Sequence, residues 1–165
     1  MQAILMSIKP YWVAKILNGD KTVEIRKRFP VDYRGWIYIY ETNDRKPLFA
    51  VNCDDKIFKK VSMSRGKVVA RFYCDKIMAN DRTNCCQGSC LSHDEILHYT
   101  RGHEFVGVHI SQLGIFDKPK ELSDFYRCRL GRNNCYMKRC DEKDCPCFKP
   151  VKKAPQSYMY IEVSE

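Results

Sequence analysis

Short connections between strand-like segments are the feature that most limits the folds open to this chain of 165 residues. Apolar or alternating runs typical of strands occur six times, at residues 3–8, 22–26, 36–42, 66–77, 107–116 and 158–163. A doubly wound parallel sheet needs a longer helix after each strand, whereas this sequence leaves room for two or three short helices. The spacing therefore predicts an α+β fold built on a mixed or antiparallel β-barrel of about six strands.

The first helix is predicted directly after the first strand. Pro10 interrupts that strand, and proline is well tolerated at the first position of a helix. Gly19 accepts the left-handed conformation in which many helices end, so the helix is expected to be short. Its apolar residues recur on one face at helical spacing: Trp12, Val13, Ile16 and Leu17.

The strand at 22–26 alternates between polar and apolar residues, which is typical of a strand with one buried face. Val23 and Ile25 are expected to face the core. Because side chains alternate along a strand, Thr22, Glu24 and Arg26 are expected to share the opposite face.

The chain is expected to form one domain, 1–165, with an inserted loop and helix at 80–104. Ser92 is suited to cap the start of the inserted helix, and Glu95 is placed three residues later to complete a capping box. Gly102 is expected to end this helix. A cysteine-rich loop at 127–150 is the second addition to the barrel.

Two further stretches have weaker patterns. Residues 118–125 suggest a short helical turn, and the polar stretch from 43 to about 65 is either an extended loop or carries one irregular strand around 48–51.

The charge of the chain favours a negatively charged partner. Its 29 lysine and arginine residues exceed its 20 aspartate and glutamate residues, which leaves a net charge of +9. This excess suits RNA or a nucleotide, although a diffuse excess of lysine can also serve solubility alone. No run approaches the roughly 18 apolar residues of a membrane-spanning helix, and the first residues lack the basic start of a secretory signal. We therefore expect a cytoplasmic protein with no membrane partner.

One short motif carries a resemblance to a known family. Gly19, Lys21, Glu24 and Arg26 form a Gly-x-Lys-x-x-Glu-x-Arg core, which is preceded by the segment 7–12. This arrangement resembles the N-terminal signature of ASCH domains, which belong to the PUA-like superfamily. Segment 66–77 resembles the central strand of the family, and segments 109–111 with 117–122, and 154–158, are similar to further blocks of its phage and bacterial members. The resemblance implies a PUA-like barrel with a cleft beside the first helix.

The residues around this motif suit a cleft that binds a nucleotide. Cationic side chains are concentrated there, and an arginine can donate two hydrogen bonds to a phosphate or a base edge. Trp12 offers a flat surface for stacking a base, although a large aromatic on this helix face also suits the core. The predicted ligand-binding residues are Lys9, Trp12, Lys21, Glu24, Arg26, Lys27, Gln156 and Ser157. We interpret the chain as a binding module for nucleic acid, in particular RNA, or for a modified nucleotide.

An enzymatic function is the alternative. Some small ASCH-like proteins are amidohydrolases that act on N4-acylated cytidine through a lysine, a threonine and a distant glutamate. Lys21 matches that lysine, but Glu24 occupies the position of the threonine. If the chain is an enzyme, Lys21, Thr22 and Glu24 are its candidate catalytic residues, with Glu95 or Glu104 as the distant glutamate. A ribonuclease that uses Lys21 with a tyrosine is a weaker alternative.

The chain has ten cysteines, and half of them lie within one short loop. Zinc prefers four soft ligands in a tetrahedron, and a basic loop with few apolar residues is the kind of segment that a metal orders. Four of these five cysteines are therefore candidates for a structural zinc site: Cys128, Cys135, Cys140, Cys145 and Cys147.

Free thiols or an iron–sulfur cluster are the alternatives to zinc in this loop. Cys85, Cys86 and Cys90 lie in a separate group that could supply one ligand. Cys53 and Cys74 are isolated and are expected to be small buried residues.

Overall fold

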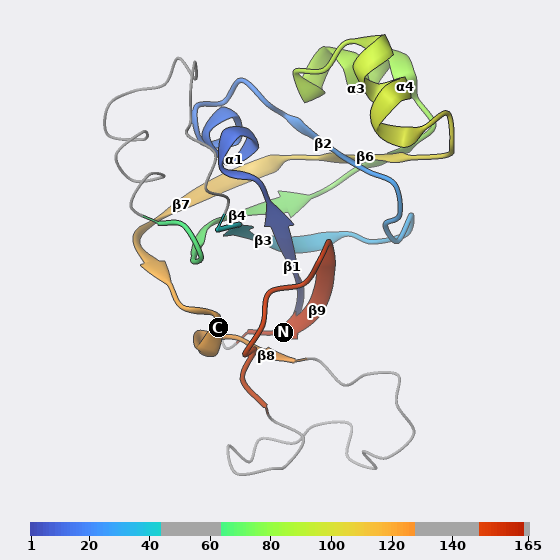
Figure 1. Ribbon diagram of the computed structural model, residues 1–165. Helices are drawn as coiled ribbons and strands as arrows, with labels where there is room; N and C mark the ends of the chain where they lie inside the picture. The colour runs from blue at the N-terminus through green and yellow to red at the C-terminus, as the bar shows by residue number, and fades with distance from the viewer. Residues whose placement is uncertain (44–63, 128–148, 164–165) are drawn as a thin grey trace.

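The computed structural model of the chain describes residues 1–43, 64–127 and 149–163 (Figure 1). The possible strand at 48–51, Cys53 and all five cysteines of the predicted zinc loop lie outside these residues. The described part contains nine strands in two sheets, three α-helices and one 3₁₀ helix. This is the α+β, sheet-dominated architecture that the strand spacing predicts.

The larger sheet has six strands. Their order across the sheet is β7 (Ser111–Lys120), β4 (Val68–Cys74), β3 (Gly35–Glu41), β1 (Gln2–Ile8), β9 (Tyr158–Glu162) and β8 (Tyr126–Arg127). Only the pairing of β1 with β3 is parallel, and the other neighbours are antiparallel. The terminal amine of Met1 donates a hydrogen bond to the carbonyl of Val163, so the described ends of the chain lie side by side.

Both faces of this sheet are covered near its centre. Alternate β1 residues, Ile4 and Met6 among them, join a core that includes the buried face of helix α1 (Pro10–Leu17). Leu5 belongs to a second core on the other face, together with Phe125 and Val151. The continuous burial of β1 follows from this arrangement, because a strand covered on both sides has no polar face.

The smaller sheet consists of β2 (Val23–Arg26), β6 (Val106–His109) and β5 (Ile77–Ala79), in that order. Helices α3 (Arg82–Ser89) and α4 (His93–Thr100) lie beside this sheet, at the opposite end of the molecule from β8 (Figure 1). Val23, Ile25, Cys85 and Ile96 pack together in the core between the sheet and these helices. The insert thus covers the apolar face of β2.

Two strands predicted to be continuous are each divided between the sheets. The segment 66–77 forms β4 in the large sheet and β5 in the small one, and 107–116 forms β6 and β7. The chain changes sheets at neighbouring positions, where His109 Nδ1 lies 2.6 Å from Asp75 Oδ1. The apolar pattern continues from β4 into β5 and from β6 into β7, because each strand packs against a core of its own. The sequence therefore does not indicate where one strand ends and the next begins. These divisions and the short β8 raise the strand number from six to nine.

Helix α1 and helix α4 form as the sequence predicts, whereas α3 was not predicted. Ser92 accepts a hydrogen bond from the backbone of Glu95, whose side chain accepts one in return from the backbone of Ser92. The predicted turn at 118–125 forms only as the 3₁₀ helix η1 (Leu122–Asp124), because residues 118–120 remain in β7. No helix in the described part of the chain is long and apolar enough to span a membrane.

Candidate functional site

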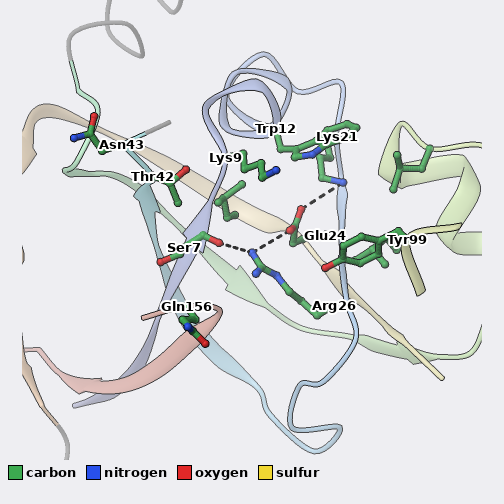
Figure 2. Close-up of a pocket in the computed structure, with 13 residues that line it drawn as sticks. Ser7, Lys9, Trp12, Lys21, Glu24, Arg26, Thr42, Asn43, Tyr99 and Gln156 are labelled. Carbon is green, nitrogen blue, oxygen red and sulfur yellow. Dashed lines mark hydrogen bonds and ion pairs between the residues drawn. The ribbon is translucent and has the colours of Figure 1, made fainter. Parts of the chain in front are cut away.

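A cavity of about 740 Å³ opens between α1, β2 and the inserted helix α4. Six of the predicted ligand-binding residues line it: Lys9, Trp12, Lys21, Glu24, Arg26 and Gln156 (Figure 2). They come from three separate parts of the chain. Gln156 lies two residues before β9, which pairs with β1. The fold therefore brings the C-terminal segment to the motif near the N-terminus.

Glu24 lies between two cations on the wall of this cavity. Its Oε2 atom is 3.4 Å from Lys21 Nζ, and its Oε1 atom is 3.0 Å from Arg26 Nη2. Figure 2 shows these contacts as one chain of interactions. Less than a tenth of each of the three side chains is exposed. Glu24 and Arg26 do share a strand face, but both faces of β2 are buried, which the alternating pattern did not indicate.

Lys21 is held in place from three sides. Its Nζ atom donates a hydrogen bond of 2.8 Å to the carbonyl of Ser89 at the end of α3, and it lies 4.8 Å from the centre of the Trp12 ring. Burial lowers the pKa of Lys21 from its ordinary value, and the nearby Glu24 carboxylate partly opposes this shift. Lys21 therefore occupies one face of Trp12, so that face is not free to stack a base.

Arg26 connects β2 to the large sheet. Its Nη2 atom donates a hydrogen bond of 2.8 Å to the carbonyl of Ser7, and its Nη1 atom is 3.4 Å from Ser157 Oγ. Among the described residues, its buried Nε atom has no hydrogen-bond partner. Ser157 thus supports Arg26 rather than lining the cavity. A ligand acceptor beside Nε would satisfy this unpaired donor.

Tyr99 of helix α4 forms the wall opposite α1, and its hydroxyl points toward Glu24 and Arg26 (Figure 2). Burial raises the pKa of its hydroxyl above the ordinary value. Lys27 does not line the cavity, but its Nζ atom lies 5.0 Å from the centre of the Tyr99 ring. Sequence reasoning missed Tyr99 because it belongs to the insert, and no local pattern connects that helix to the motif.

Other unpredicted residues complete the lining, among them Ser7, Thr42, Asn43 and Leu91. Ser7 Oγ already donates a hydrogen bond of 2.6 Å to the carbonyl of Pro155. The buried Thr42 Oγ1 atom has no partner within the described part of the chain. A polar residue inside an otherwise apolar strand, as Ser7 is in β1, is the one sequence signal that could have indicated this lining.

Three candidate catalytic residues lie away from the cavity. Thr22 precedes β2, so strand alternation does not place it beside Glu24; it is exposed and its backbone contacts Gly88 of α3. Glu95 is engaged in the capping box of α4. Glu104 is exposed and does not line the cavity.

The predicted zinc site falls on residues that the structure does not describe. Within residues 1–43, 64–127 and 149–163, no three histidine, cysteine or acidic side chains are grouped to hold a metal ion. Cys74 is buried, as predicted, and Cys85 is buried against the small sheet. Cys86 is partly exposed and Cys90 is exposed.

Comparisons with known proteins give a similarity in fold. No protein-family model matches the sequence, and no curated protein sequence matches it. The crystal structure of ASCH from Zymomonas mobilis is similar, with a TM-score of 0.52, 21% sequence identity and coverage of 73% of each chain. A single-residue variant of that protein gives a TM-score of 0.52 at 20% identity, covering 73% of this chain and 76% of the other. The chain therefore shares its fold with that ASCH protein.

Proposed function

We propose that the chain is a member of the ASCH family and binds a nucleobase in this cavity, either from RNA or from a modified nucleotide. The observation that carries the proposal is the Glu24 carboxylate, held between Lys21 and Arg26 on the cavity wall. It supplies an acceptor directly beside two donors, in a space of about 740 Å³. Cavities of this size are typical of sites for small molecules.

The mixed charges favour a base over a phosphate at the centre of the site. A phosphate beside Arg26 would lie close to the Glu24 carboxylate, and the two anions would repel each other. A base edge carries donors and acceptors together, so an exocyclic amino group can donate to Glu24. The unpaired Arg26 Nε can donate to a ring nitrogen or carbonyl of the same base. This pairing suits cytosine or adenine better than uracil.

Tyr99 is the aromatic side chain best placed to contact the base. Lys21 covers one face of Trp12, whereas 43% of Tyr99 is exposed and its hydroxyl points into the cavity. Lys9 and Lys27 are exposed near the opening, where they can attract the phosphate of a nucleotide. The base then occupies the interior and the phosphate the rim.

Calorimetric titration with CMP, AMP, UMP and inorganic phosphate tests this proposal. CMP and AMP are expected to bind more tightly than UMP, and Glu24→Gln is expected to weaken CMP binding by roughly tenfold. Glu104→Gln makes the same chemical change at an exposed position outside the cavity, so its affinities should equal those of the unchanged protein. Equal affinity for CMP and inorganic phosphate would show that the site recognises phosphate and would refute base recognition.

An amidohydrolase acting on N4-acylated cytidine is the second candidate, because burial lowers the pKa of Lys21. A lysine with a lowered pKa can take up a proton during catalysis nearer to neutral pH. Thr22 lies outside the cavity and the Ser7 hydroxyl is already donated to Pro155, so neither is poised beside Lys21 as a nucleophile. Incubation with N4-acetylcytidine tests the amidohydrolase, and incubation with labelled RNA tests the ribonuclease that the sequence left as a weaker alternative. Deacylation or cleavage that Lys21→Ala abolishes would replace the binding proposal with an enzymatic one.

A further inference from the structure

The large sheet carries a second group of aromatic and basic residues, on the face that does not support α1. Ile37 and Ile39 of β3 belong to the core beneath α1, whereas Trp36 and Tyr38 associate with the other core. The same face of the neighbouring strands carries Arg71, Tyr73, Phe116 and Lys120, which we call, with Trp36 and Tyr38, the aromatic face. This surface is independent of the cavity.

Strand register brings these side chains together. Trp36 lies opposite Tyr73, and Tyr38 lies opposite Arg71. The rings of Trp36 and Tyr73 are 5.5 Å apart in an edge-to-face arrangement, and the Arg71 guanidinium lies 4.4 Å from the centre of the Trp36 ring. Trp36, Arg71 and Tyr73 all remain partly exposed. A guanidinium stacked on an indole presents a second flat face to solvent.

Within the described part of the chain, Arg71 is held without a carboxylate. Its Nη1 atom lies 3.5 Å from the Tyr38 hydroxyl, and no acidic side chain in the described part of the chain forms an ion pair with it. Gly114 of β7 lies directly opposite Arg71 and supplies no side chain that would cover it. A fixed, partly exposed cation that pairs with no anion among the described residues is suited to an anion from outside.

Lys120 repeats this arrangement farther along the sheet. Its Nζ atom lies 4.9 Å from the centre of the Phe116 ring, and Phe116 stacks on Tyr38 at 6.0 Å. Lys120 is exposed and, among the described residues, forms no ion pair. Two cations on aromatic rings therefore lie on one sheet surface, joined through Tyr38.

We propose that the aromatic face binds single-stranded nucleic acid. Arg71 and Lys120 contact successive parts of the phosphate backbone, and unpaired bases stack on Trp36, Tyr73 and the exposed plane of the Arg71 guanidinium. Alternating cations and rings fit such a strand because every nucleotide offers both an anion and a flat base. A duplex would keep its bases stacked on each other, and an acidic peptide would leave the rings without flat partners.

The two tryptophans of the chain allow the cavity and the aromatic face to be measured separately. Trp12→Phe leaves Trp36 as the only tryptophan, and Trp36→Phe leaves Trp12. In the Trp12→Phe variant, a short oligouridine is expected to quench the fluorescence of Trp36. This result does not depend on whether CMP changes the fluorescence of Trp12 in the Trp36→Phe variant. Unchanged Trp36 fluorescence, with the oligouridine shown by anisotropy to be bound, would place the strand elsewhere and overturn the proposal. Failure of CMP binding would affect only the function proposed for the cavity.

Salt dependence tests the role of the two cations. Arg71→Gln with Lys120→Gln is expected to weaken oligouridine binding at least roughly tenfold at low salt. It should also reduce the slope of log affinity against log salt by about 0.7 for each phosphate that the protein no longer neutralises. Arg82→Gln with Arg101→Gln is the control, because it removes equal charge from exposed positions on α3 and next to α4.

Two results would contradict the proposal: an equal reduction of affinity and slope in that control, or displacement of the oligouridine by polyglutamate at equal charge concentration. The first would mean that only the net charge matters, and the second that any polyanion fits. Oligodeoxythymidine in the same titration shows whether the face distinguishes RNA from DNA. Thermal unfolding confirms that each variant is folded before its affinity is compared.

Discussion

Glu24 in β2 and Glu41 at the end of β3 are both shielded from solvent, with 7% and 0% of their surface exposed. The two carboxyl groups nevertheless have opposite surroundings. Glu24 has a cation on each oxygen, whereas neither oxygen of Glu41 has a hydrogen-bond partner in the described part of the chain. Burial raises the pKa of Glu41 to about 8, and the charge of Arg65 opposes that shift only in part.

The comparison shows that burial alone does not make a carboxyl group part of a site. Glu24 lines the cavity and is held by cations that are fixed in turn by Ser89 and Ser7. Glu41 does not line it, and its pKa is raised to about 8 because the charge of Arg65 compensates for its desolvation only in part. The surroundings of Glu24 are organised for a ligand, whereas the burial of Glu41 only costs free energy of folding.

Glu24→Gln is expected to have the largest effect on stability. Removing the carboxylate charge leaves Lys21 and Arg26 as neighbouring buried cations, which typically costs about 3–5 kcal/mol when a buried pair is broken. Urea unfolding at neutral pH measures the change. Glu104→Gln is the matched control and should stay within about 0.5 kcal/mol of the unchanged protein. A destabilisation as small as that of the control would mean that the network contributes nothing and that the contrast with Glu41 is wrong.

The site was only partly predictable from the sequence. The resemblance of the Gly19–Arg26 motif to the ASCH signature implied a cleft lined by Lys21, Glu24 and Arg26, and all three line the cavity. Tyr99 was not predictable, since it reaches the cavity only through the packing of an insert on β2. The residues before Glu41 in β3 face two cores in alternation, so the sequence of this strand is apolar on both sides. That pattern does not indicate that the strand ends in a buried carboxyl group.

The pH dependence of stability is expected to reveal Glu41. Its folded-state pKa of about 8 is higher than that of the unfolded chain, so the folded state keeps a proton that the unfolded state has released. The resulting stability is complete below the unfolded pKa and disappears as pH rises toward 8. Between about pH 6 and about pH 8, the unchanged protein should lose about 2 kcal/mol relative to Glu41→Gln. Urea unfolding across this range measures the difference.

The same titration in Glu24→Gln should retain the Glu41 contribution, because Glu41 lies on a different strand and, among the described residues, forms no ion pair or hydrogen bond with the Lys21 network. A parallel pH profile for Glu41→Gln and the unchanged protein would show that Glu41 has an ordinary pKa. In that case a partner pairs its carboxylate, and the distinction between the two glutamates disappears.

The fold was more predictable than the site. Its elements were predicted correctly wherever the local sequence pattern and the tertiary packing agree. The cap formed by Ser92 and Glu95 is a local pattern, and it forms as expected. Helix α3 has few apolar residues and no such clear pattern; it is held by Cys85 packing into the core of the small sheet. The division of β4 from β5 was equally hidden, because both halves have apolar faces.

Ser92→Ala is expected to give the smallest effect, about 1 kcal/mol for loss of an N-cap. This change separates the two regions by their dependence on the insert, since α4 carries Tyr99 to the cavity while Glu41 lies on β3 of the large sheet. Hydrogen exchange should accelerate first at the amide of Glu95, which loses the Ser92 oxygen as its acceptor. The pH dependence assigned to Glu41 should stay unchanged. If this pH dependence changed together with hydrogen exchange in α4, the insert and the large sheet would unfold as one unit. The insert would then not be a separable addition that completes the cavity.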